Sequence, residues 1–244
     1  MVATALAAAL CAVWTPAAAS GEPAACGSGA HGRPGYGYAG HQSALAAHGI
    51  RATITPLAAP PVAAGHVAGW VGVGGRGTGP GGADQWLQVG VASLPGAPLL
   101  LYAEITLAGR EPAFRLLEDG AAVGQPRRVA VLEVSGRPDW WRVWVDGRPV
   151  TEPVHLAGSG GRLRPIATSE SWNGGSRACN AFSFRFEDVA VAGGAGGTWR
   201  TFVPGSTFRD AGFHLRQLAP GRPSRSRTLA AQPYAPFAFV AAAG

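Results

Sequence analysis

The sequence predicts an all-β protein in which two antiparallel sheets pack as a sandwich or jelly roll. Short apolar or alternating runs recur along the chain, and Gly, Pro, Asp and Asn separate them. No segment of the body carries a dozen residues at helical spacing, which argues against parallel βαβ units. Hydrophobic residues make up 47% of the 244 residues and charged residues 14%, so the chain can bury a core and is not intrinsically disordered.

Each expected strand is a short run of this kind. In chain order, the runs are 50–55, 66–73, 85–93, 99–107, 113–117, 128–134, 140–145, 150–156, 162–171, 181–191 and 198–203. The runs 140–145 and 150–156 flank Asp146-Gly147, a typical hairpin turn. Alternation places Trp141 and Trp140 on opposite faces of the first of these strands. We expect Trp141 and Trp144 to pack in the core.

The ends of the chain differ in character from this body. Residues 1–19 are apolar and finish with Ala17 and Ala19 in the A-x-A positions of a signal peptidase site, which predicts a signal peptide and a secreted protein. Residues 20–48 are rich in Gly, Ala and His and read as a loosely ordered arm. The sandwich domain is expected at 49–203. Residues 204–244 combine Pro and Arg in an extended or disordered tail, whose last apolar patch, 234–240, is expected to pack back on the body as a strand or an arm.

Cysteine usage and charge restrict the partners. Removal of the signal peptide leaves Cys26 and Cys179, which could form a disulfide in an oxidising compartment or remain two buried thiols. Neither Cys nor His shows a metal-binding spacing, so no metal is expected. Residues 60–203 hold 13 Arg and 12 acidic residues, whereas 204–244 hold five Arg and one Asp. Because the body is nearly neutral, nucleic-acid binding is not expected. No later run is long enough to insert stably in a membrane.

One glycine-rich segment matches a dinucleotide-binding motif, but the residues that follow it do not fit such a site. The segment 72–77 matches G-x-G-x-x-G, but Gly79 and Pro80 follow it and cannot open a helix that would receive a pyrophosphate. No cofactor is therefore expected.

Two of the expected strands place a polar side chain beside a tryptophan. In 86–91, Trp86 and Gln88 share one face while Leu87 points to the core. In 168–172, Glu170 and Trp172 share one face. Such strands would give a sheet a cleft with polar groups at its centre and aromatic walls.

These segments, in the order 69–74, 86–91, Tyr102-Ala103-Glu104 and 169–172, resemble the glutamic peptidases, or eqolisins. The resemblance implies a concanavalin A-like sandwich and a secreted endopeptidase that cleaves polypeptides at acid pH. It also implies Gln88 and Glu170 as the catalytic pair. The substrate-binding residues that follow from it are Trp86, Tyr102, Glu104 and Trp172.

The alternative is a non-catalytic carbohydrate-binding, lectin-like or structural sandwich. Trp86, Tyr102, Trp172, Trp140 and Trp144 could then form a platform for the sugar rings of a polysaccharide. Fold alone does not distinguish the two functions. In either case we expect a monomer.

Overall fold

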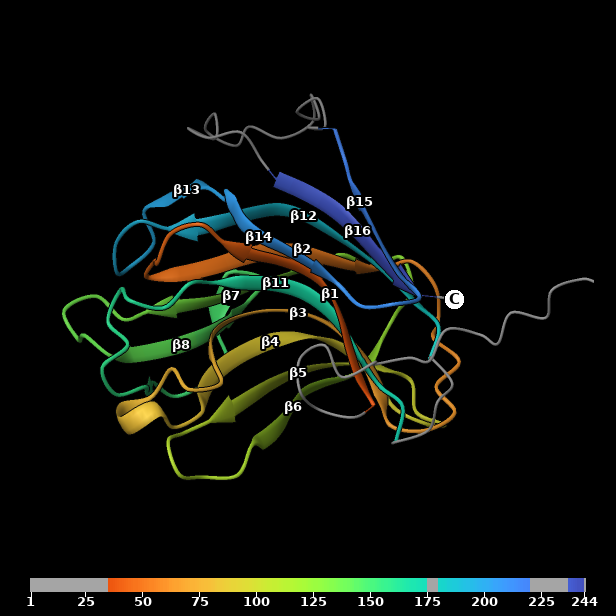
Figure 1. The fold of residues 1–244 in the computed structure, drawn as a ribbon, viewed down its shortest axis with the longest axis horizontal. Helices are drawn as coiled ribbons and strands as arrows, with labels where there is room; N and C mark the ends of the chain where they lie inside the picture. Colours follow the sequence, from red (N-terminus) through yellow and green to blue (C-terminus); the bar gives the residue numbers. More distant parts are fainter. Residues whose placement is uncertain (1–34, 175–179, 220–236, 244) are drawn as a thin grey trace, which may run out of the picture.

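A computed structural model describes residues 35–174, 180–219 and 237–243, and it confirms the predicted two-sheet antiparallel sandwich. Figure 1 shows the two sheets packed face to face. The first sheet has seven strands. In spatial order they are β14 (Pro204–Arg209), β1 (Tyr36–Ser43), β11 (Ile166–Trp172), β3 (His66–Gly75), β4 (Gln85–Ser93), β5 (Leu99–Thr106) and β6 (Ala113–Ala121).

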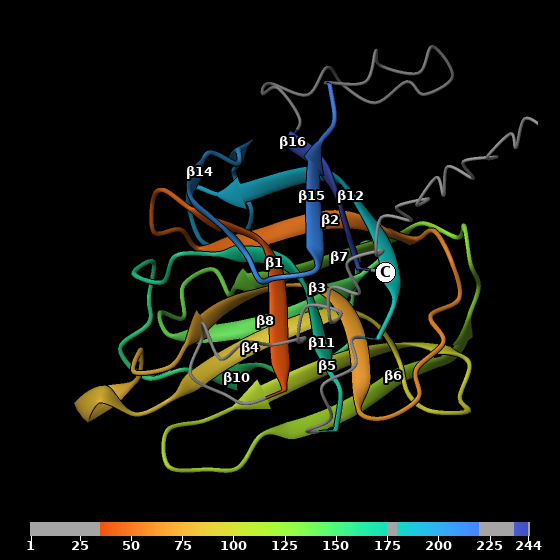
Figure 2. The same ribbon diagram turned by 45° about the vertical axis from the view of Figure 1, so that its right-hand side comes forward.

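The second sheet has nine strands. Its main path is β10 (Val154–His155), β8 (Trp140–Val145), β7 (Arg127–Glu133), β2 (Gly49–Pro56), β12 (Phe182–Ala192), β16 (Phe237–Ala243) and β15 (Phe213–Gln217). Two short strands complete it, β13 (Trp199–Thr201) beside β12 and β9 (Arg148–Pro149) beside β8. A single 3-10 turn, η1 (Pro80–Gly82), interrupts the β structure of the described residues. Figure 2 shows β12, β15 and β16 together at one end of the molecule.

The core lies between the sheets and is built from the inward side chains of both. On β4, Leu87, Val89 and Val91 are fully buried there, as their alternation with Gln88 predicts. From the other sheet, Phe186 and Phe239 stack with ring centroids 4.5 Å apart. Apolar burial on this scale is the main stabilising contribution to such a fold.

The hairpin at Asp146-Gly147 forms as predicted. Both residues have positive φ, 49° and 82°, as a two-residue hairpin turn with matching twist requires. The strand that follows is much shorter than expected, because pairing with β8 is limited to β9 and β10. Trp141 is fully buried and donates its indole N–H to Ser159 Oγ at 2.7 Å. The expectation for Trp144 was wrong, since it lies on the outer face and is only partly buried.

The sandwich extends beyond its expected range, 49–203, at both ends. Strand β1 comes from the predicted arm and lies inside the first sheet, between β11 and β14. Its inward residues include Gly37 and His41, which are not apolar enough to give a strand pattern. Strands β14 and β15 come from the predicted tail and each closes one sheet edge. The last apolar patch does pack back as a strand, β16.

Several expectations concern residues outside the described ranges. These are the signal peptide at 1–19, the first part of the arm at 20–34, and Cys26 and Cys179. Within the described ranges, no helix has the length and apolar character needed to cross a membrane.

Candidate functional site

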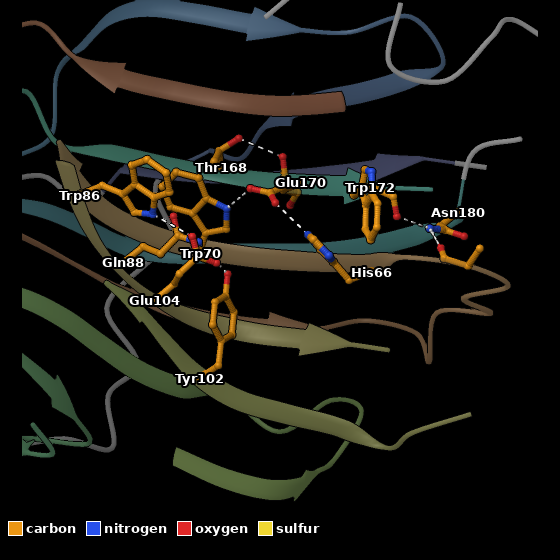
Figure 3. Close-up of polar contacts among 12 residues, drawn as sticks. His66, Trp70, Trp86, Gln88, Tyr102, Glu104, Thr168, Glu170, Trp172 and Asn180 are labelled. Carbon is orange, nitrogen blue, oxygen red and sulfur yellow. Dashed lines mark hydrogen bonds and ion pairs between the residues drawn. The ribbon is translucent and has the colours of Figure 1, made fainter. Parts of the chain in front are cut away.

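The candidate site lies on the outer face of the first sheet, where β11, β3 and β4 run side by side. The pairing register sets Glu170 opposite Ala68 and Gln88 opposite Gly72, so both candidate side chains extend from the same face of the sheet. Strand β3 separates them, and its Trp70 lies between Gln88 and Glu170 (Figure 3).

A glycine beside Trp70 makes this arrangement possible. Gly90 is the partner of Trp70 on β4. A Cβ at position 90 would lie 2.1 Å from the carbonyl oxygen of Gly69 and 2.7 Å from Cβ of Trp70, both far inside contact distance. Any side chain there would displace β3 from β4 and move Trp70.

Glu170 is held by donors on both carboxylate oxygens. Trp70 Nε1 donates to Oε2 at 3.0 Å, and His66 Nε2 lies 2.9 Å from Oε1. The residue is 8% exposed, so the carboxylate is almost enclosed. Two fixed donors orient the carboxylate in one direction, which is what a positioned proton acceptor needs.

Gln88 is 6% exposed and donates from Nε2 to the hydroxyl of Tyr102 at 3.2 Å. Burial raises the pKa of Tyr102 well above 10, and the charges of Glu170 and Glu104 raise it further, while the Gln88 hydrogen bond opposes this shift. Tyr102 therefore keeps its proton and lies within electrostatic reach of Glu170. Tyr102 was expected as a substrate-binding residue; in the structure it is buried and its hydroxyl accepts a hydrogen bond from the amide of Gln88.

The remaining predicted residues fall into two groups, one on each side of Trp70. Trp86 Nε1 donates to Glu104 Oε1 at 2.8 Å, beside Gln88. Trp172 lies on the Glu170 side and stacks on Tyr36 at 5.9 Å. Its backbone carbonyl accepts from Nδ2 of Asn180 at 3.0 Å (Figure 3).

A small cavity of about 130 Å³ lies beside Glu170 on this face of the sheet. Glu170 and His66 line one side of it, and Tyr102, Glu104 and Phe114 line the other. The small side chains of Ala68 and Ala92 also line it, and these two residues are directly opposite each other on β3 and β4. Since a water molecule occupies about 30 Å³, this space can hold a few waters next to the Glu170 carboxylate.

Two residues of the site, His66 and Trp70, were not predicted from the sequence. They lie four residues apart on β3 and therefore share a face, which the sequence does indicate. Their contact with Glu170 depends on the register of β3 against β11, and no local pattern specifies that register. In the described parts of the chain, no group of three His, Cys, Asp or Glu side chains could hold a metal ion.

Comparison with known proteins supports the two-sheet fold. No protein-family model matches the sequence, and no curated protein matches it. The structure matches scytalido-glutamic peptidase, solved with a transition state analog inhibitor, with a TM-score of 0.52 and 12% identity over 86% of this chain and 99% of that one. The fold resembles that of the glutamic peptidases. SCP-B, a member of the eqolisin family solved with the tripeptide Ala-Ile-His, matches with a TM-score of 0.50, 12% identity and the same coverage.

Proposed function

We propose that this protein is a glutamic-type endopeptidase that hydrolyses peptide bonds at acid pH through Gln88 and Glu170. The observation that carries the proposal is the placement of a buried, oriented carboxylate and a buried amide on one face of the sheet, with Tyr102 within reach of both. The fold shared with the glutamic peptidases supports it.

Glu170 acts first as the general base. A water in the adjoining cavity gives a proton to the Glu170 carboxylate while its oxygen bonds to the scissile carbonyl carbon. The carbonyl π electrons move to oxygen, giving a tetrahedral intermediate. When the C–N bond breaks, protonated Glu170 returns the proton to the leaving nitrogen. The products are a carboxylic acid and an amine, and the enzyme is restored.

Gln88 stabilises the charge that develops on the carbonyl oxygen. An amide nitrogen carries two hydrogens, so Gln88 can donate one to Tyr102 and the other to the oxyanion. One donor of this kind lowers the barrier by about 3 kcal/mol in other acyl-transfer enzymes. Trp86 and Trp172, one on each side of the pair, supply apolar surface for the substrate chain.

The test is hydrolysis of a denatured protein between about pH 2 and 6, where a carboxylate base would operate. Glu170→Gln and Gln88→Ala should each lower the rate of cleavage about a hundredfold or more while far-ultraviolet circular dichroism stays unchanged. The matched controls are Glu111→Gln and Gln217→Ala, which alter exposed residues of the same type. Wild-type cleavage in the Glu170 and Gln88 variants, or no cleavage by the wild-type protein, would overturn the proposal.

We also propose that the protein is exported and that residues 1–19 are removed. Mass spectrometry of protein recovered from the culture medium should then give a chain that begins at Ser20. Peptide mapping without reduction should find Cys26 and Cys179 linked. An intact Met1 in protein retained inside the cell contradicts export, and two free thiols contradict the disulfide.

A further inference from the structure

A second cavity, of about 460 Å³, opens on the outer face of the nine-stranded sheet, on the opposite side of the sandwich from Glu170. Its walls include two tryptophans, Trp144 on β8 and Trp199 on β13. The strand register places Trp144, Ala130 and Arg51 opposite one another, in one row across β8, β7 and β2. The small side chain of Ala130 leaves the space between the aromatic walls open.

Three arginines give this cavity its charge. Arg51, Arg128 and Arg142 line it from three adjacent strands. The guanidinium carbon of Arg51 lies 4.5 Å from the Trp199 ring centroid, a cation–π contact that holds it in place. Nε of Arg142 is buried and has no hydrogen-bond partner among the described residues. A buried donor without a partner is costly in free energy.

The one acidic residue in the lining does not neutralise these arginines. Glu133 is 2% exposed, and its side chain points to the inner face of β7. There it pairs with His48 and accepts the backbone N–H groups of Asp139 and Gly161. The Glu133 carboxylate is therefore engaged on the inner face of the sheet, and the three arginines make the lining of the cavity positively charged.

We infer that this cavity binds an acidic saccharide, a sugar ring that carries a carboxylate or a sulfate group. The Trp144 ring supplies flat apolar area for a sugar ring, and guanidinium groups bind carboxylate and sulfate oxygens through paired N–H donors. The volume is within the usual range for a small-ligand site. A nucleic acid fits less well, because residues 60–203 are nearly balanced in charge, with 13 Arg and 12 acidic residues. The site is separate from the proposed peptidase centre and does not depend on it.

The experiment is calorimetric titration of the full protein with three acidic probes: trigalacturonate and a mannuronate trimer, which carry carboxylates, and a keratan sulfate disaccharide, which carries sulfate without a carboxylate. Maltotriose serves as the neutral sugar and ATP as the nucleotide. At least one acidic probe should bind, more weakly as NaCl rises through 0.5 M, and maltotriose should not. The carboxylate and sulfate probes distinguish the two sources of charge.

Variants locate the binding. Arg142→Met and Trp144→Ala should each weaken the binding of the acidic probe at least tenfold. Arg137→Met and Trp140→Ala are the matched controls. Trp140 is the first residue of β8, the guanidinium carbon of Arg137 lies 4.3 Å from its ring centroid, and neither residue lines the cavity. Unchanged thermal melting confirms that each variant folds. Absence of binding by all three acidic probes, equal losses in the control variants, or binding of ATP alone would overturn the inference.

Discussion

His41 should make the protein less stable in mildly acidic solution. Its imidazole lies between the sheets, edge-on to Phe237 and Phe239 at 5.1 and 4.7 Å, with Nδ1 2.9 Å from Thr207 Oγ1. Burial lowers the pKa of His41 from 6.5 to about 4. The folded protein therefore keeps the imidazole neutral down to about pH 4, whereas the unfolded chain protonates it near pH 6.5.

The sign and size of the effect follow from proton linkage. Above pH 6.5 neither state binds a proton at His41, and stability does not depend on this residue's titration. Between pH 6.5 and 4 the unfolded state binds more protons, so the free energy of unfolding falls as the pH falls. The loss is about 2 kcal/mol at pH 5 and about 3 kcal/mol at pH 4 for this pKa difference, and it levels off below pH 4.

The measurement is urea unfolding of the wild-type protein and of His41→Gln, which is neutral at every pH, between pH 7.5 and 4. The difference in free energy of unfolding between the two should change by about 3 kcal/mol across this range, in favour of the variant at low pH. His214→Gln, at an exposed position, should keep the wild-type pH dependence. Parallel curves for wild type and His41→Gln, or an NMR titration of His41 with a midpoint near 6.5, would refute the reasoning.

Three further changes test the site. Gly90→Ala should lower the free energy of unfolding in urea by more than about 2 kcal/mol, because the new Cβ would clash with the carbonyl oxygen of Gly69. The control is Gly194→Ala, whose Cβ would have no atom within 4 Å and which should change this free energy by less than about 0.5 kcal/mol. Trp70→Phe removes the N–H donor to Glu170 and should lower kcat about tenfold or more with little change in KM. His66→Ala removes the second donor and should also lower kcat and alter the pH profile of kcat, which a purely structural role would not do.

The sequence predicts this fold well where a strand has one apolar face. In β4, the apolar Leu87, Val89 and Val91 alternate with Gln88, and both the strand and its orientation follow from that pattern. Strand β1 has the same geometry but its inward side chains are small or polar, so the pattern is absent. What identifies it as a strand is its pairing with β11 and β14, which is a long-range property.

The site is predictable only in part, for the same reason. Gln88 and Glu170 follow from short motifs, and alternation correctly places each beside a tryptophan. The partners of Glu170 depend on which residue of β3 faces it, and that register is set by core packing across the whole sheet. The role of Tyr102 also required the structure, since its burial and its contact with Gln88 are not visible in the motif.

The most direct test of the central claim is kcat/KM at acid pH for Glu170→Gln, Gln88→Ala and the double variant. If the two side chains act on one reacting carbonyl, Gln88→Ala should lose about 10²- to 10³-fold and Glu170→Gln at least as much. The double variant should then be little worse than Glu170→Gln alone, as for residues that act as a unit. Wild-type kcat/KM in Glu170→Gln, or losses in the double variant that multiply fully, would contradict the account.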